Sequence, residues 1–366
     1  MLLELPKSRL DVRSTEEMTI DELCFLRETL ETSETIRRYV SEHRPRRGGR
    51  VFGLVSLLLL YLLMECRKTT YRGVIRNLSD HDCICLGLID ENGRPRRPSY
   101  ATLNGFVNRV LAPMAEAIGE EITEAVLKTS LRTYTLDSTP LQASRYNKDA
   151  EYSTHYEIRM DKAHILMADG YPLYMLQSDG NANDSPFAAP LIGRLPRARP
   201  SHGKMEFHAD GAYDSFLTYS RVYVSTGAVL RCNQGTDAGV HGVDEAAIRN
   251  EYAGMWKRDG YDPYRKNDLD FMLRFLCKNG REELVGKHLR DRSMRMNEAE
   301  EKEAVDERAG GRKNVRHVCE TMHRAMKRWV DLSIFRLVKR TKEARIRCRF
   351  LCLQLLSLLF RGYVSS

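Results

Sequence analysis

The sequence predicts an α/β protein in which a mixed sheet flanked by helices follows a helical N-terminal region. Residues 1–128 carry apolar side chains at helical spacing. From about residue 131 to residue 232, short segments of alternating polar and apolar residues follow one another with helical segments between them, which is typical of a sheet domain. We therefore expect three parts: a helical N-terminal region over 1–128, a sheet domain formed by 129–235 together with 312–361, and an insertion over 236–311.

The composition is that of a soluble globular protein rather than a disordered one, with 42% hydrophobic and 30% charged residues among 366. A formal net charge of +8 favours an acidic partner such as nucleic acid. The nine cysteines form no repeated CxxC pair, which predicts a reducing, cytoplasmic location without structural disulfides. The most apolar run, Val55–Met64, is about half as long as a membrane-spanning helix, so we expect a buried helix and no membrane partner.

Short basic helices are expected within the N-terminal region. Thr19–Glu22 has the form of a helix capping box, and TTYRGVIRNL at 69–78 places apolar residues on one helical face with arginines beside it. Such helices joined by turns suit a helix-turn-helix-like reader of DNA. The basic segment HRPRRGGR at 43–50 has two interpretations, a solvated linker or an arm that contacts phosphates.

The sheet domain is expected to contain its elements in the order β, β, β, α, β, α, β. Its first strand, RTYTLD, ends at Asp137. Two further strands within 156–180 are joined at Asp169-Gly170, because Asp-Gly is a strong hairpin signal. The remaining elements are a helix over 185–195, a strand over 204–210, a short helix from Tyr213 and a strand over 221–232.

Two later segments are expected to be helical. Residues 236–311 are polar and rich in charge, and a loop of that length without structure would be unusual, so we expect helices such as LDFMLRFLCKNG at 269–280. The C-terminal segment ARIRCRFLCLQLLSLLF at 344–360 is leucine-rich, and we expect it to pack in a core.

Three acidic residues are candidate metal ligands. Asp137 ends one predicted strand, Asp210 ends another, and Glu320 lies on a helix predicted over 312–330. Strand ends that meet a helix can bring distant carboxylates together, and three carboxylates form an oxygen cage suited to Mg²⁺. Two such ions can flank a scissile phosphate, one at the attacking oxygen and one at the leaving oxygen. A turn-forming role for each aspartate is the alternative.

The predicted helix over 312–330 places Arg316, Glu320 and Lys327 within about 60° of one another, beside an apolar stripe that can face a core. The carboxylate of Glu320 is thus flanked by two cations on one helical face. Exposed helices often carry such charges as solvated i,i+4 pairs, so the spacing alone leaves this alternative open.

Together these segments resemble the DDE transposases of prokaryotic insertion sequences, in the subgroup whose final motif is Y-(2)-R-(3)-E-(6)-K. LDSTPL at 136–141 resembles the first-aspartate block, and HADGAYDS at 208–215 resembles the second-aspartate block. Where the family has the tyrosine of the final motif, this chain has Lys313, which puts one DNA contact of the family in doubt. The likeness covers most of the chain and is weakest over 236–311. The three final positions that match are Arg316, Glu320 and Lys327.

The resemblance implies an RNase H-like fold in which Asp137, Asp210 and Glu320 hold two Mg²⁺ ions, with Mn²⁺ able to substitute. It implies that water cuts a strand at the transposon end and that the freed 3′-hydroxyl then attacks target DNA. The implied partners are double-stranded DNA, as terminal inverted repeats and target, and a second copy of the chain in a homodimer on DNA. The implied location is the cytoplasm, in association with the nucleoid. The residues implied to contact DNA phosphates are Arg316, Lys327 and Lys313.

Two other functions stay open: a catalytically inactive, DNA-binding remnant of a transposase, and an RNase H-like nuclease that cuts without joining. Four weaker candidate residues have more ordinary interpretations. Asp214 is expected to start a helix rather than bind a metal ion. His164 and His208 are expected on strands as packed or surface residues, although His208 shares a face with Asp210. Trp256 is expected to pack, with stacking on an unpaired base as the alternative.

Overall fold

The computed structural model describes most of the chain, and the statements below concern the described residues. They are 20–43, 52–129, 131, 133–143, 150–154, 156–196, 205–232, 243–259, 268–306, 330 and 339–361. Three of the predicted features therefore lie wholly or largely outside the described residues: the capping residue Thr19, the basic segment at 43–50 and the helix over 312–330.

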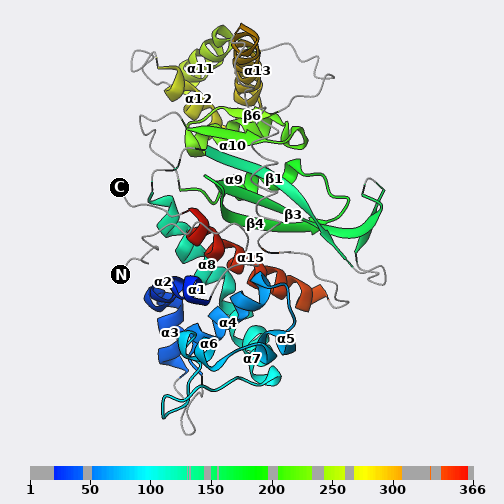
Figure 1. Cartoon of the computed structure of the whole chain (residues 1–366). Coiled ribbons are helices and arrows are strands. Elements are labelled where there is room, and N and C mark those ends of the chain that lie inside the picture. The colour runs from blue at the N-terminus through cyan, green and yellow to red at the C-terminus, as the bar shows by residue number, and fades with distance from the viewer. Residues whose placement is uncertain are drawn as a thin grey trace.

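The described residues of the N-terminal region form helices joined by turns, with one isolated β-bridge between Ile89 and Pro95 (Figure 1). At its centre, α4 is apolar on all sides, and every residue from Leu57 to Cys66 is buried, which confirms the prediction for the leucine-rich run. The helices α5 and α7 contact each other through the edge-to-face rings of Tyr71 and Tyr100, 5.8 Å apart. The helix-turn-helix-like interpretation stays a prediction. The elements are α1 Ile20–Cys24, α2 Leu26–Thr32, α3 Glu34–Glu42, α4 Leu54–Cys66, α5 Tyr71–Arg76, α6 Asp80–Cys85, α7 Tyr100–Phe106, the π-helix η2 Val107–Leu111 and α8 Ala112–Leu127.

A mixed sheet follows, as the sequence predicted, and it has six strands rather than the five expected, because the short strand β2 was not foreseen. Its strand order is β2-β3-β1-β5-β6, and β4 also pairs with β3. The strand β3 pairs antiparallel with β1, β2 and β4, whereas β1, β5 and β6 pair in parallel. The strands are β1 Thr133–Gln142, β2 Glu151–Ser153, β3 Ile158–Ala168, β4 Tyr171–Asp179, β5 Glu206–Ala209 and β6 Leu230–Cys232.

The hairpin between β3 and β4 turns at Asp169-Gly170, which confirms the predicted position. Both residues have positive φ, at 45° and 76°, as a two-residue turn of the primed type requires. The Asp169 carboxylate also accepts a hydrogen bond from the backbone N–H of Thr133, at 2.9 Å. The turn therefore fixes the start of β1 as well as the register of the hairpin.

The strand predicted over 221–232 is wrong for its first half. The helix α10 runs from Phe216 to Thr226, is capped by Ser215 and ends at Gly227, which has a left-handed φ of 76°. Only Leu230–Cys232 forms a strand, β6. The buried residues Tyr219, Val222, Tyr223 and Thr226 recur at helical spacing and face neighbouring helices, so tertiary packing overrides their β propensity.

Helices occupy the described residues of the predicted insertion, which confirms that expectation. They are α11 Glu245–Asp259, α12 Leu269–Lys278 and α13 Glu282–Asp306. In Figure 1 these three helices lie beyond β6 and α10, at the end of the sheet opposite the N-terminal helices. The longest of them, α13, packs along α10.

Two further helices, α9 and α15, pack against the sheet. The helix α9, Ser185–Ile192, falls within the predicted segment and packs on β3 and β4. The C-terminal helix α15, Lys339–Arg361, packs against both α8 and β4, as Figure 1 also shows. Its Gln354 is buried and donates hydrogen bonds to Thr123 of α8 and to the carbonyls of Pro172 and Leu173 in β4. The leucine-rich C-terminus is thus core, as predicted. No helix in the described parts of the chain is long and apolar enough to cross a membrane.

Candidate functional site

Two of the three predicted carboxylates lie side by side. The parallel strands β1 and β5 are in register from Thr133 opposite Glu206 to Leu136 opposite Ala209. Asp137 follows Leu136 on β1, and Asp210 follows Ala209 at the end of β5. Asp210 keeps an extended backbone, with φ −68° and ψ 157°. Paired residues of parallel strands point to the same face, and neighbouring strands lie about 4.8 Å apart. Extended by one residue, this register places Asp137 and Asp210 side by side, and we expect their carboxylates to share a face of the sheet.

The strand carrying Asp137 is longer than predicted. The prediction that β1 ends at Asp137 is wrong, because β1 continues to Gln142 along β3. What ends near Asp137 is the neighbouring strand β5, whose last residue is Ala209. Beyond this point β1 pairs with β3 on one side, and no strand among the described residues pairs with it on the other, an edge position that tolerates Pro140.

Backbone amides orient both aspartates. Asp210 lies directly after β5, as predicted, and its Oδ1 accepts the N–H of Gly211 at 2.7 Å, which caps the short helix η3, Gly211–Tyr213. The Oδ1 of Asp137 accepts the N–H of Ser138 at 2.8 Å. Asp210 is exposed and Asp137 is half-buried. Hard carboxylate oxygens of this kind suit Mg²⁺.

The third carboxylate cannot be placed beside them, because Glu320 lies outside the described residues. The same holds for the three predicted phosphate contacts. Within the described ranges, no group of three or more His, Cys, Asp or Glu side chains is placed to hold a metal ion. The structure thus brings together Asp137 and Asp210. The residues beyond its description are Glu320, Arg316, Lys327 and Lys313.

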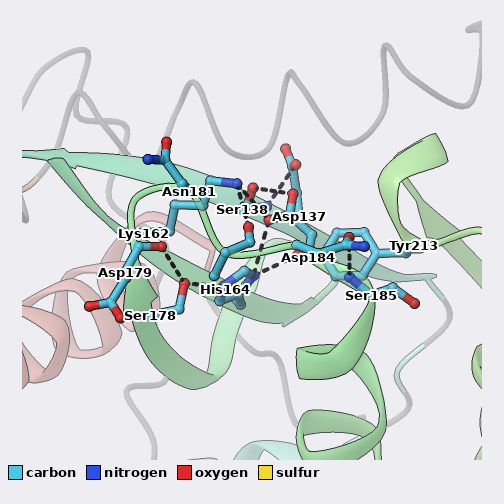
Figure 2. Close-up of polar contacts among 12 residues, drawn as sticks. Asp137, Ser138, Lys162, His164, Ser178, Asp179, Asn181, Asp184, Ser185 and Tyr213 are labelled. Atoms are coloured by element: carbon cyan, nitrogen blue, oxygen red, sulfur yellow. Dashed lines mark hydrogen bonds and ion pairs between the residues drawn. The ribbon is translucent and has the colours of Figure 1, made fainter. Parts of the chain in front are cut away.

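A buried polar cluster lies directly behind Asp137, centred on Asp184 (Figure 2). Asp184 Oδ2 accepts a hydrogen bond from Ser138 Oγ at 2.8 Å, and its Oδ1 accepts one from Lys162 Nζ at 3.0 Å. Lys162 also donates to the carbonyl of Ala182 at 2.9 Å. The side chains of Lys162 and Asp184 are 17% and 11% exposed. The residue after Asp137 is therefore tied to a largely buried ion pair.

His164 completes this cluster as a neutral histidine. The hydroxyl of Ser178 donates to the carbonyl of Asp179, so it accepts from His164 Nε2 at 2.8 Å, which leaves Nδ1 to accept from the Tyr213 hydroxyl at 3.1 Å. Burial lowers the pKa of His164 from 6.5 to about 4, although the Asp184 carboxylate opposes the shift. The 3.8 Å approach of Nδ1 to Asp184 is therefore no ion pair at neutral pH.

Tyr213 connects this cluster to the two candidate ligands. Burial raises the pKa of its hydroxyl well above 10, and the negative charges of Asp184, Asp137 and Asp210 add to the shift. Tyr213 is thus a neutral donor positioned near all three carboxylates. From this cluster the sequence analysis considered only His164, as a packed or surface residue. The spacing of Ser138, Lys162 and Asp184 along the sequence does not indicate that their side chains are in contact.

The weaker candidates have structural roles in the described residues. Asp214 ends η3 and is paired with Arg290 of α13, and the residue that caps the start of the next helix, α10, is its neighbour Ser215. His208 is buried in β5, with its Nε2 3.2 Å from the Glu206 carboxylate. Trp256 lies in α11, and its side chain is outside the described part of the structure.

No family model, no curated protein and no solved structure matches this chain. Its function is therefore inferred from the residues and from the geometry above.

Proposed function

We propose that this protein is a DDE-type transposase that cuts DNA at transposon ends in a metal-dependent reaction and joins the freed strand to target DNA. The observation that carries the proposal is the placement of Asp137 and Asp210 next to each other, from two strands 73 residues apart in sequence. The sequence alone predicts both residues as metal ligands. The proposal rests on this pairing together with the resemblance of the three sequence blocks.

The sheet supports an RNase H-like fold for this domain. Across the sheet, the five main strands lie side by side in the order β4-β3-β1-β5-β6, and β3 runs opposite to the other four. The strands β1, β3 and β4 thus form an antiparallel meander, and β5 and β6 add in parallel on the other side of β1. This arrangement places Asp137, in the middle of β1, beside the carboxyl end of β5 at the centre of the sheet, where the proposed site lies.

The oxygen ligands present fit a pair of Mg²⁺ ions, for which Mn²⁺ can substitute. When bound, such ions activate the attacking oxygen and stabilise the leaving oxygen of a phosphate ester. Asp137 and Asp210 would hold them from the sheet, and Glu320 would complete the set from its predicted helix. In the proposal, Arg316, Lys327 and Lys313 hold DNA phosphates beside the cut.

The partners follow from the reaction. The net charge of +8 favours attraction to double-stranded DNA. Two transposon ends must be brought to one target, so we propose that the chain acts as a homodimer on DNA. Its place would be the cytoplasm, in association with the nucleoid.

The test uses the full-length protein, a plasmid carrying the DNA that flanks the gene, and Mg²⁺ or Mn²⁺. We expect nicking at one inverted-repeat end and 3′ ends covalently joined to a second plasmid. Asp137→Asn and Asp210→Asn should each abolish both products while leaving DNA binding in place. The matched control is Asp179→Asn, which changes an exposed carboxylate at the end of β4 and should keep full activity. Cutting that persists in Asp137→Asn would overturn the proposal.

The same assay separates the two alternatives. Metal-dependent cutting without joined products indicates an RNase H-like nuclease. Salt-sensitive DNA binding with no cutting under any metal indicates an inactive transposase remnant, a possibility raised by Lys313 in place of the family tyrosine. In either case the strand-transfer proposal fails.

A further inference from the structure

A largely buried ion pair joins the helical insertion to the turn that carries Asp210. Arg290 of α13 donates two hydrogen bonds to Asp214, from Nε to Oδ1 at 2.8 Å and from Nη2 to Oδ2 at 2.6 Å. The two side chains are 7% and 12% exposed. A two-pronged contact of this kind fixes direction as well as distance, because the guanidinium and the carboxylate must be coplanar. Arg290 therefore determines where the Asp214 carboxylate lies.

Asp210 and Asp214 are the first and last residues of one short backbone turn. The N–H of Tyr213 donates to the Asp210 carbonyl at 2.9 Å, and the N–H of Asp214 donates to the Gly211 carbonyl at 3.0 Å. Asp210 caps the same turn with its carboxylate, through the N–H of Gly211. The turn of residues 210–214 is thus held at its start by the β5 ladder and at its end by Arg290.

The backbone that carries Arg290 is itself closely packed. One helical turn earlier, Gly286 lies against the carbonyl of Phe216 at the start of α10, where a Cβ would stand only 2.0 Å from the carbonyl oxygen. The helices α10 and α13 can therefore approach only because Gly286 has no side chain. This contact fixes the distance between α13 and the start of α10, so Arg290 reaches Asp214 from a fixed position.

Stability alone does not explain a buried ion pair at this place. Desolvation offsets much of the attraction between two buried charges, and apolar residues of similar size often stabilise a fold equally well. What apolar side chains cannot supply is the direction of a forked hydrogen bond. The pair can therefore fix the geometry of the turn in a way that apolar side chains cannot, besides whatever its loss would cost in free energy of unfolding.

We propose that Arg290 is a positioning residue for the metal site: through Asp214 it holds the 210–214 turn so that the Asp210 carboxylate stays beside Asp137. This inference rests on the proposed function, since it assigns the helical insertion a part in assembling the metal site. The insertion is then a support for the site and not an independent appendage. A shift of the turn by a few tenths of an ångström would separate the two carboxylates and weaken metal binding.

The experiment measures Mn²⁺ affinity of the full-length protein without DNA, from the electron paramagnetic resonance signal of free Mn²⁺. Arg290→Lys keeps the charge but loses the fork, and we expect about 10-fold weaker binding, as for other residues that orient metal ligands. Asp214→Asn should weaken binding to the same extent. The double variant should be no worse than either single one, because both remove the same contact. The matched control is Arg295→Lys, which alters the exposed Arg295–Asp291 pair on the same helix and should leave the affinity unchanged.

A second measurement, the unfolding midpoint of each variant, distinguishes a positioning role of Arg290 from a role in stability alone. Each variant is titrated at a temperature well below its unfolding midpoint, alongside Gln354→Ala, which removes a buried side chain far from the turn in sequence and should lower the midpoint without changing Mn²⁺ affinity. Wild-type affinity in both folded Arg290→Lys and folded Asp214→Asn would overturn the inference while leaving the proposed function intact. A wild-type protein that binds no Mn²⁺ and cuts no DNA would overturn the proposed function, and this inference with it.

Discussion

Acidification should destabilise the fold through His164, whose side chain is fully buried. A histidine in the unfolded chain titrates near 6.5, whereas burial lowers the pKa of His164 in the fold to about 4. Between these values the unfolded state binds a proton that the folded state does not, so the free energy of unfolding falls as the pH drops from 6.5 towards 4. The pKa difference corresponds to a loss of about 3 kcal/mol of unfolding free energy, which is complete below pH 4. About 2 kcal/mol of this loss has already occurred at pH 4.5.

Urea unfolding of the wild type and of His164→Gln, each at pH 7 and pH 4.5, measures this effect. Glutamine can accept from Tyr213 and donate to Ser178, yet it does not titrate. Other titrating groups act in both proteins, so the difference between them isolates His164. We expect the wild type to lose about 2 kcal/mol more than the variant on acidification. Equal pH dependence in the two proteins would refute the assignment of His164 as a buried neutral histidine.

Two further substitutions test packing and charge near the proposed site. Gly286→Ala should lower the free energy of unfolding by about 1–3 kcal/mol, because its Cβ meets a backbone carbonyl. The control Gly105→Ala, whose Cβ would meet no described atom within 4 Å, should cost nothing, and thermal unfolding of both variants compares them. Asp184→Ala should cost about 3–5 kcal/mol in urea unfolding, because it leaves the largely buried Lys162 ammonium without its carboxylate. The double variant with Lys162→Met should recover part of that loss, and no recovery would contradict the explanation.

Local signals in the sequence were sufficient for much of the fold. The Asp-Gly pair specified the β3–β4 turn, because few residue pairs tolerate positive φ at both positions. The leucine run over α4 specified a buried helix, because a helix that is apolar on all sides has no face for solvent. Each of these features depends on residues within a few positions of one another, which a single sequence shows directly.

Contacts between distant segments were not visible in the same way. The residues of α10 include Val222 and Val224, whose β-branched side chains favour a strand, and their helical state depends on packing against α13, more than 60 residues later. The Ser138–Asp184–Lys162 contacts join three segments with no common motif. The sequence offers no signal for such pairings, because each partner alone is an ordinary polar residue.

The position of Asp137 shows why a wrong boundary can still indicate the right place. The sequence predicted a strand end there, and the structure instead has a strand that continues after its neighbour β5 has ended. In open sheets of this kind, ligands bind outside the carboxyl ends of strands where the strand order reverses direction. Here the order reverses at β1, with β3 and β4 on one side and β5 and β6 on the other. Asp137 and Asp210 lie at that reversal, so the sheet topology favours a binding site at the same residues that the sequence singled out by their chemistry.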